Sequence, residues 1–347
     1  MIRHALEALS TGRHLTRAEA DAAMEQILAG RSNDSEIAEL LTALRAKGES
    51  LDEVVGFAQA MRRHATPIFP RGHSLADEAL VDTCGTGGDV SGTFNISTAA
   101  AFVVAGAGVR VAKHGNRSIS SRCGSADVLE QLGARIDLPA ERVAQSIAEI
   151  GIGFLFAPAV HASTRHAMAA RRELKSRTIF NLLGPLTNPA SASAQVVGVY
   201  DAEVTELMAQ ALGELGVRRA FVVHGADGLD EISISGETSI SELRNGAVQN
   251  YRVTPEDFGL RRAPLDSIRG GDAKENSEII HKILGKSLLY REHTAHREIV
   301  LANAAAALVA AGSAADFRDG VDLAMRSIDS GAAREKLDAF AAFTQRD

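Results

Sequence analysis

The chain has 347 residues, of which 45% are hydrophobic and 23% are charged, so it can form about two domains with sizeable cores. Its net charge of −7 and its aromatic content of 4% argue against broad binding to nucleic acid or to an anionic membrane. The longest apolar run, AAAFVVAGAGV, is far shorter than the roughly 20 residues of a membrane span. The start MIRHALEALS lacks the apolar centre of a signal peptide, and Cys84 and Cys123 are typical of reduced thiols. We expect a soluble cytoplasmic protein in which any cationic site is local.

The first part of the chain predicts helices. Three residue pairs have the spacing of a capping box, which satisfies backbone donors at a helix start: Thr16 and Glu19, Asn33 and Glu36, and Ser50 and Glu53. Gly30 and Gly48 stand where two of these helices should end. We therefore expect a small all-helical domain over residues 1–72, ending in the proline-containing linker ATPIFPRGHS, residues 65–74.

Beyond the linker, short apolar runs alternate with helical patterns. Five runs are typical of buried strands: EALVDTC, GVRVAKHG, GIGFLFAP, AQVVGVY and RAFVVHG. Helices are expected over residues 140–150 and 203–215 and from Glu275 onward. This alternation predicts a larger α/β domain with a central, largely parallel sheet flanked by helices. The period-two pattern ISISGETSISEL predicts a hairpin that turns at Gly236.

The stretch DTCGTGGDVSGTFNIST, residues 82–98, is a candidate anion site. After the predicted strand it contains three glycines, which let backbone amides approach a ligand closely: Gly85, Gly87 and Gly88. Asn95, Ser97 and Thr98 then lead into a very apolar helix, whose open N–H groups favour a phosphate. The stretch matches neither the dinucleotide fingerprint nor a Walker A loop. On the glycines alone, a tight turn before a helix remains an alternative.

A second candidate loop, VAKHGNRSISSRCGSAD, begins at the end of the next predicted strand. Lys113, Arg117 and Arg122 bring positive charge into a segment rich in serine and glycine, and Ser125 has the position of a helix N-cap. A solvated basic loop is the alternative for this segment alone. Two such loops at successive strand ends favour anion binding.

Asp230 and Glu231 follow the predicted strand RAFVVHG. Because Mg²⁺ uses one or two carboxylates together with water and substrate phosphate, this pair opposite phosphate loops suggests a metal bridge; an exposed turn is the alternative. The histidine pairs His161/His166 and His293/His296 do not match a zinc motif. No covalent nucleophile motif and no certain general base stands out. The apolar NLLGPLTNP predicts a rigid loop of undecided function.

Seven motifs in this order resemble the anthranilate phosphoribosyltransferase family of tryptophan biosynthesis: GTGGD, FNIST, KHGNR, GSADVLE, RTIFNLLGPLTNPA, DGLDE and ENSEII. The resemblance extends over nearly the whole chain. It implies transfer of the 5-phosphoribosyl group of phosphoribosyl pyrophosphate (PRPP) to the amino group of anthranilate, with release of pyrophosphate. This reaction is the second step of the tryptophan branch from chorismate. The resemblance also implies about two Mg²⁺ ions and a homodimer formed through the helical domain.

The family fold further implies that a helical segment near residues 165–190 joins the small domain, leaving residues 73–164 and 191–347 for the α/β domain. Matched motif by motif, the family's PRPP contacts fall on Gly85, Gly88, Asp89, Thr93, Asn95, Ile96, Ser97, Thr98, Lys113, His114, Gly115, Asn116, Arg117, Ser118, Ile119, Ser120, Ser121 and Ser125. The magnesium ligands fall on Ser97, Asp230 and Glu231. The anthranilate contacts fall on Gly85, Asn116 and Arg171, with His161 and Pro185 as pocket walls. A guanidinium such as that of Arg171 can bind a carboxylate in bidentate fashion.

Two segments depart from the family pattern, and both lie near the acceptor end. HAST, residues 161–164, replaces the common His-Pro-Ala-Met, and RRELKSRT replaces the more usual Gly-Ile before Arg177. One alternative function is that of a pyrimidine nucleoside phosphorylase, which has a similar fold and uses phosphate and a nucleoside. KHGNR and the Asp230–Glu231 pair favour PRPP instead. A silent relative that binds nucleic acid is the other alternative, but it should show a broad basic face.

Overall fold

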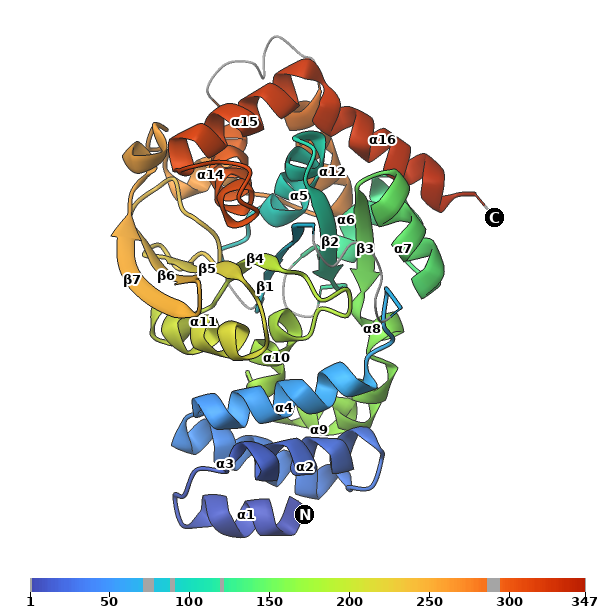
Figure 1. Ribbon diagram of the computed structural model, residues 1–347, viewed down its shortest axis with the longest axis vertical. Coiled ribbons are helices and arrows are strands. Elements are labelled where there is room, and N and C mark those ends of the chain that lie inside the picture. Colours follow the sequence, from blue (N-terminus) through green and yellow to red (C-terminus); the bar gives the residue numbers. More distant parts are fainter. Residues whose placement is uncertain (1, 71–77, 88–90, 119–121, 286–293, 347) are drawn as a thin grey trace.

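The structure is a computed structural model that describes residues 2–70, 78–87, 91–118, 122–285 and 294–346. Figure 1 shows an elongated molecule with a helical part around the N-terminus and an α/β part at the other end. The helical part begins with four helices: α1 (Ile2–Ser10), α2 (Arg17–Leu28), α3 (Asp34–Lys47) and α4 (Leu51–His64).

The helix boundaries in this part follow local sequence signals. Thr16, Asn33 and Ser50 each form the predicted capping box with the glutamate three residues later. Gly48 follows the last residue of α3 with φ 85°, and Gly30 lies two residues beyond α2 with φ 70°. The predicted starts and ends of these helices are therefore confirmed.

One seven-stranded sheet forms the centre of the α/β part. Its strands are β1 (Leu80–Gly85), β2 (Arg110–Gly115), β3 (Ile152–Phe156), β4 (Ala194–Gly198), β5 (Arg219–Gly225), β6 (Thr238–Arg244) and β7 (Ala247–Val253). Their order is β3-β2-β1-β4-β5-β6-β7, with β1 to β5 parallel and the last two antiparallel. The five predicted strands and the largely parallel sheet are confirmed.

The predicted hairpin over ISISGETSISEL is wrong. β6 starts only at Thr238, and its hairpin turn with β7 lies at Asn245 and Gly246, with φ 53° and 78°. An Asn-Gly pair suits a two-residue hairpin because both positions need positive φ. The segment before Gly236 does not extend as a strand, because the Ser233 hydroxyl donates to Asp227 at 2.5 Å and folds it back on the preceding turn.

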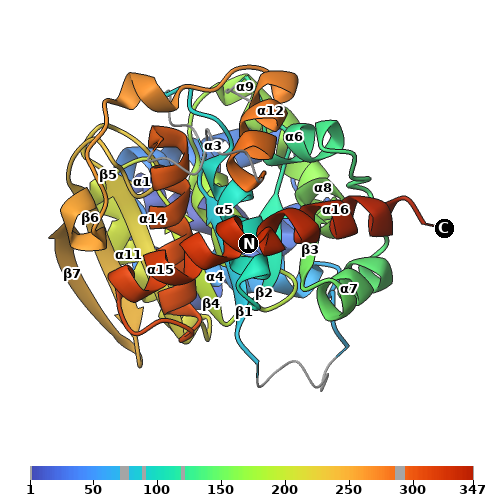
Figure 2. The same cartoon turned by 90° about the horizontal axis from the view of Figure 1, so that it is seen from above.

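Helices cover both faces of the sheet. Figures 1 and 2 show α5, α14, α15 and α16 on the face away from the N-terminal helices, while α10 and α11 lie on the other face. The bounds of the remaining helices are α5 (Ile96–Gly106), α6 (Ser125–Gln131), α7 (Ala140–Glu149), α8 (Ala157–Val160), α9 (Met168–Leu174), α10 (Ile179–Leu186), α11 (Thr205–Glu214), α12 (Ala273–Leu284), α14 (Ala295–Ala310), α15 (Phe317–Ser330) and α16 (Ala332–Thr344). No helix within the described ranges is both long and apolar enough to span a membrane.

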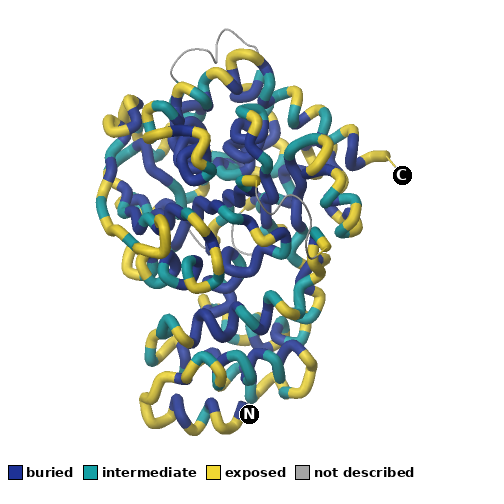
Figure 3. Tube along the Cα trace, viewed as in Figure 1, coloured by how far each residue is buried: buried dark blue, intermediate teal, exposed yellow. Residues whose placement is uncertain are grey.

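Alternating strand residues build two large cores. Val196 and Phe221 face a core formed with α5 and α14, whereas Val197 and Val222 face a second core. That second core continues into α2, α3 and α4 and also includes residues of α9 and α10. Figure 3 shows the buried residues running without interruption from the sheet into the helical part. The lower face of the sheet and the helical part therefore share one core.

Arg62 on α4 joins the two parts by hydrogen bonds. Its guanidinium donates to the carbonyl of Leu186 at 2.7 Å and to that of Leu215 at 2.6 Å, at the ends of α10 and α11. Burial lowers the pKa of Arg62 to about 10, so the side chain stays charged at neutral pH. A cation at a helix C-terminus is stabilised by the partial negative charge there.

Glu53 on α4 is a fully buried carboxylate that organises the helical part. It accepts hydrogen bonds from the backbone N–H groups of Leu15 and Ser50, both at 2.8 Å, and from Lys47 Nζ at 2.9 Å. Burial raises the pKa of Glu53, but these hydrogen bonds outweigh burial and place the pKa below its ordinary value. Glu53 therefore connects the starts of α2 and α4 to the end of α3.

We expect Glu53→Gln to lower the free energy of unfolding by about 2 kcal/mol at neutral pH, because an amide cannot accept all of these hydrogen bonds. Since the folded-state pKa is depressed, the stabilisation is present above the unfolded-state value of about 4.3 and is lost as the pH falls through the folded-state pKa. Urea unfolding across pH measures both effects. Glu7→Gln, whose side chain is 79% exposed, serves as the control. A wild-type-to-variant difference that stays constant into acid would contradict the assignment.

Candidate active site

The strand order places a candidate site at the ends of β1 and β4. From β1 the chain continues to β2 and β3 on one side and later returns to β4 on the other. In open α/β sheets, ligands bind outside the carboxyl ends of the strands at such a point of reversal. Both strands end in glycine there, and Gly85 pairs with Gly198.

Asp230 explains why both strand ends are glycines. A Cβ on Gly198 would lie 1.5 Å from the Asp230 carbonyl oxygen, and a Cβ on Gly85 would lie 2.9 Å from Asp230 Oδ2. The segment after β5 therefore packs directly on the two strand ends. Asn303 on α14 fixes this segment, because it accepts the Ile232 N–H at 2.9 Å and donates to the Ile232 carbonyl at 3.1 Å.

The first turn of α5 meets the same carboxylate pair. The Ser97 N–H donates to Glu231 Oε1 at 3.1 Å, and Lys113 Nζ donates to Ser97 Oγ at 3.2 Å and to the Thr83 carbonyl. The predicted metal ligands Ser97, Asp230 and Glu231 thus come together around the end of β1. No cluster of three or more His, Cys, Asp or Glu side chains that could bind a metal occurs in the described part of the chain. Two carboxylates and a hydroxyl are hard oxygen ligands, which fit Mg²⁺ that completes its shell with phosphate and water.

Lys113 is buried beneath this site, with 3% of its surface exposed. Burial lowers its pKa, and the neighbouring carboxylates Asp82, Glu231 and Asp230 act in the opposite direction. Its ammonium group donates to the Thr83 carbonyl on β1 and to Ser97 Oγ on α5, so it supports the start of α5 from the sheet. Lys113 therefore places its charge beneath the start of α5.

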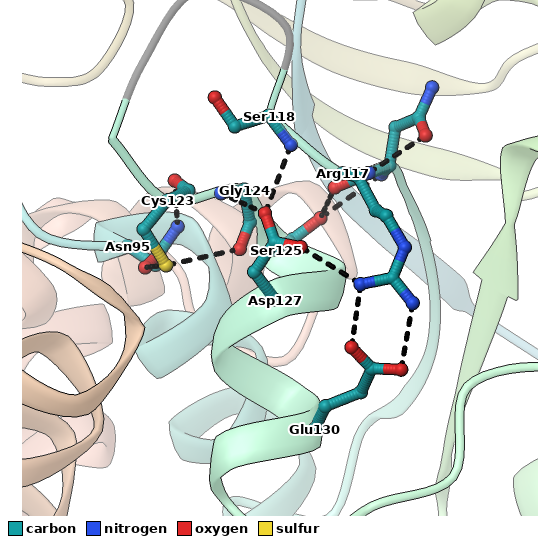
Figure 4. A network of polar contacts seen from close by, with 9 residues as sticks. Asn95, Arg117, Ser118, Cys123, Gly124, Ser125, Asp127 and Glu130 are labelled. Carbon is teal, nitrogen blue, oxygen red and sulfur yellow. Dashed lines mark hydrogen bonds and ion pairs between the residues drawn. The ribbon is translucent and has the colours of Figure 1, made fainter.

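Arg117 and Ser118 of the second loop are bound to α6, as Figure 4 shows. The Arg117 guanidinium pairs with Glu130 at 2.6 and 2.8 Å and with Asp127 at 3.0 Å, and these acids raise its pKa. The Asp127 carboxylate also accepts the Ser118 N–H at 3.0 Å and the Gly124 N–H at 2.9 Å. In this structure Arg117 therefore binds α6.

The prediction that Ser125 is the N-cap of this helix is wrong. Gly124 is the N-cap and Ser125 is the first helical residue. A Cβ at position 124 would lie 2.3 Å from the Ser118 nitrogen, so a side chain does not fit at the cap. The Ser125 hydroxyl instead accepts the Asn116 N–H and donates to the Asn116 carbonyl, both at 3.2 Å.

Asn95 links the two loops to each other. As the N-cap of α5 it forms no side-chain capping bond. Its Nδ2 donates to the Cys123 carbonyl at 3.1 Å, and its Oδ1 accepts from Asn276 Nδ2 on α12 at 3.0 Å (Figure 4 shows the Asn95–Cys123 contact). The ENSEII motif, to which sequence reasoning gave no role, therefore supports the glycine loop through Asn276.

His114 and His161 form a third group, on the side of β2. Their ring centroids are 5.1 Å apart, and His114 Nδ1 donates to the Gly184 carbonyl at 3.2 Å. Burial lowers the pKa of His114 to about 3 and that of His161 to about 4, so both rings are neutral at pH 7. Both Nε2 atoms are buried without a hydrogen-bond partner among the described residues. Pro185, in α10, directly follows the Gly184 that His114 contacts.

Arg171 on α9 is half-buried and stacks on Phe180 of α10, with 4.9 Å between its guanidinium carbon and the ring centroid. Within the described ranges it forms no ion pair, and burial lowers its pKa. Such a guanidinium can accept a planar carboxylate. Lys175, in the segment that departs from the family pattern, has φ 47°, a conformation that costs about 1 kcal/mol outside glycine.

The remaining predicted PRPP contacts divide into two groups. Gly88, Asp89, Ile119, Ser120 and Ser121 lie outside the described residues. Of the others, Thr93 lies before α5 and forms a β-bridge with Arg269. Ile96 and Thr98 lie in the first turn of α5. The Thr98 Oγ1 atom is buried and has no hydrogen-bond partner among the described residues. Gly115 ends β2, and a Cβ there would lie 2.3 Å from Ser125 Oγ.

Sequence reasoning missed four supporting residues: Asp127, Gly198, Asn276 and Asn303. The glycine that ends AQVVG and the single polar residue in LANAAAAL were visible signals for two of them.

Comparison with known proteins agrees with this architecture. Residues 3–65 match the helical bundle domain of a glycosyl transferase family, and residues 77–334 match the a/b domain of that family. Anthranilate phosphoribosyltransferases from Pelotomaculum thermopropionicum and Symbiobacterium thermophilum are 53% and 54% identical to this chain; the alignments cover 99% and 98% of it and 97% of each relative.

Solved structures agree with the same family. The anthranilate phosphoribosyltransferase from Thermus thermophilus is 41% identical, with a TM-score of 0.90 and 99% of both chains covered. The enzyme from Saccharomyces cerevisiae in complex with PRPP and Mg is 27% identical, with a TM-score of 0.88, covering 99% of this chain and 97% of that one. With more than half of its residues identical to these bacterial relatives over nearly its full length, the chain belongs to the anthranilate phosphoribosyltransferase family.

Proposed function

We propose that the protein transfers the 5-phosphoribosyl group of PRPP to the amino group of anthranilate, giving N-(5-phosphoribosyl)anthranilate and pyrophosphate in tryptophan biosynthesis. The observation that carries this function is the meeting of the α5 N-terminus with the Asp230–Glu231 pair at the ends of β1 and β4. Relatives that share about half of their residues with this chain have this activity in their names. A yeast relative with the same fold was solved with PRPP and Mg.

The diphosphate of PRPP is proposed to lie over the two loops that follow β1 and β2. The first-turn amides of α5, around Ser97, provide fixed dipoles, and Lys113 adds positive charge from below. Asp230, Glu231 and the Ser97 hydroxyl would hold Mg²⁺, and we propose two ions. When bound, the metal supplies positive charge for the departing pyrophosphate.

The proposed reaction is a displacement at C1 of the ribose. The amine nitrogen forms a bond to C1 while the bond from C1 to the pyrophosphate oxygen breaks, and the electron pair leaves with pyrophosphate. The nitrogen then releases one proton. Since an aromatic amine has an available lone pair at neutral pH, the protein mainly positions the reactants and stabilises charge in an oxocarbenium-like transition state.

The acceptor is proposed to lie between α9, α10 and the end of β2. Arg171 would bind the anthranilate carboxylate, and Pro185 and Asn116 would line the pocket. His114 and His161 would contribute neutral rings whose buried Nε2 lone pairs can accept N–H groups of the amine. These rings would orient the amine without protonating it.

The proposal also covers the organisation of the enzyme. We propose a homodimer formed through the helical part and a cytoplasmic location. The domain division is proposed at residues 1–72, with a helical segment near 165–190, against 73–164 and 191–347. The packing of α9 against α3 and of α10 against α4 supports placing the segment near 165–190 with the helical part.

The decisive experiment follows the loss of anthranilate fluorescence. We expect loss that requires both PRPP and Mg²⁺, and no phosphorolysis of pyrimidine nucleosides when phosphate is supplied. An absence of PRPP-dependent loss at high enzyme concentration would overturn the acceptor assignment, and nucleoside cleavage would favour the phosphorylase alternative.

Replacing Arg171 by alanine should raise the KM for anthranilate by about 30- to 150-fold, because a charge-assisted bidentate contact contributes roughly 2–3 kcal/mol. The KM for PRPP should change little. Arg172→Ala, an exposed neighbour on the same helix, is the matched control and should behave like the wild type. Equal effects of the two substitutions would contradict the assignment.

The double variant Asp230→Asn, Glu231→Gln should need at least about tenfold more Mg²⁺ for half-maximal turnover, because both anionic metal ligands become neutral. A magnesium titration at saturating substrates measures this shift. Asp227→Asn, in the preceding turn, controls for local folding. Wild-type rates across the titration would show that the metal lies elsewhere.

A further inference from the structure

We propose that Asp82, a buried carboxylate on β1 that is not among the substrate-binding residues proposed above, is a positioning residue of the acceptor site. It connects the backbone of His114 to Asn188 and thereby fixes residues 184–190, which orient the pocket histidines. This inference rests on the proposed acceptor site. Asp82, His114 and Asn188 are all buried.

Asp82 replaces a missing part of the strand ladder. The pairing of β1 with β2 is registered only for Leu80 with Arg110 and Val81 with Val111. Beyond that point Asp82 Oδ1 accepts the His114 N–H at 3.0 Å, while the neighbouring Thr83 carbonyl accepts from Lys113 Nζ. Side chains therefore bridge β1 and β2 at the ends that carry the site. The position of His114 depends on Asp82 through its backbone.

Asn188 extends this bridge to the segment after α10. Its Nδ2 donates to Asp82 Oδ2 at 2.7 Å and to the Ala112 carbonyl at 2.9 Å, and its Oδ1 accepts the Ala190 N–H at 2.9 Å. All hydrogen-bonding positions of its NH₂ group are thus used, which leaves one orientation for the amide. Asp82 supplies one of the two acceptors that fix that orientation.

The fixed segment in turn sets the protonation pattern of the two rings. The Gly184 carbonyl binds Nδ1 of His114, and the backbone of Thr187 forms a hydrogen bond with His161. A proton on Nδ1 leaves Nε2 with its lone pair. Asp82 therefore acts on His114 by two routes. It binds the backbone N–H of His114 directly, and through Asn188 it fixes the segment whose Gly184 carbonyl binds the His114 ring. A displacement of Asp82 is expected to move both rings that face the acceptor.

The test is Asp82→Asn, which presents only one oxygen to the two donors. We expect the KM for anthranilate to rise by about tenfold or more while the KM for PRPP stays within about threefold. If Asp82→Asn does not fold, Asn188→Ser should show the same split between the two KM values.

Glu53→Gln is the matched control, since Glu53 is also a buried carboxylate that accepts from backbone and side-chain donors. It should lower the melting temperature without separating the two KM values. The inference is overturned if Asp82→Asn behaves like Glu53→Gln or if both KM values rise together. Arg171→Ala measured in parallel separates a failure of this inference from a failure of the proposed acceptor site. If the KM for anthranilate is unchanged in Arg171→Ala as well, the placement of the acceptor site itself is overturned.

Discussion

Binding a diphosphate requires positive charge that survives the removal of water, and in the proposed site the backbone at the start of α5 supplies part of that charge beside the metal. Of the three cations that the sequence places in the second loop, two are already engaged: Arg117 pairs with Asp127 and Glu130, and Lys113 is buried against Thr83 and Ser97. The first turn of α5 remains, with its partial positive charge. Gly85 and Gly198 then matter because they bring the Asp230 segment, which carries the proposed metal ligands, next to that helix end.

Glu231 connects the partial charge of the α5 N-terminus to the charge of the proposed metal. Its Oε1 accepts the Ser97 N–H, one of the amides that a phosphate oxygen would use. A carboxylate at a helix N-terminus is itself stabilised there, so the site without substrate is not left with an unsatisfied amide. If Glu231 turns toward a cation, the Ser97 amide becomes available to the diphosphate. A bound metal would draw Glu231 away from the Ser97 amide and so free that amide for PRPP. PRPP bound to the amide would in turn free Glu231 for the metal, so each ligand would favour binding of the other.

Local signals were enough for much of the fold but not for the side chains of the site. The capping boxes at Thr16, Asn33 and Ser50 and the strand runs are decided by neighbours within a few residues, and the structure confirms them. The Asn-Gly signal for the turn at Asn245 and Gly246 is equally local, but the period-two pattern around Gly236 predicts a hairpin turn at a different place. By contrast, Asn95 turns toward Asn276 across 181 positions of sequence. No spacing in the chain predicts such a contact, and the resemblance gives the residue but not its orientation.

The proposed acceptor site combines a fixed wall with a more variable one. The fixed wall is the end of β2 with residues 184–190, joined through Asp82 and Asn188. The departures from the family pattern, in HAST and around Lys175, fall on the other wall, between α8 and α10, where Lys175 adopts a left-handed conformation. His161 is bound to the Thr187 backbone, but the hydrogen bonds of Asp82 and Asn188 do not involve residues 162–164 or Lys175. These departing residues can therefore change the shape of the pocket without displacing Asp82 and Asn188. Discrimination among substituted anthranilates should therefore depend on the wall of α8 and α9, whereas orientation of the amine depends on β2.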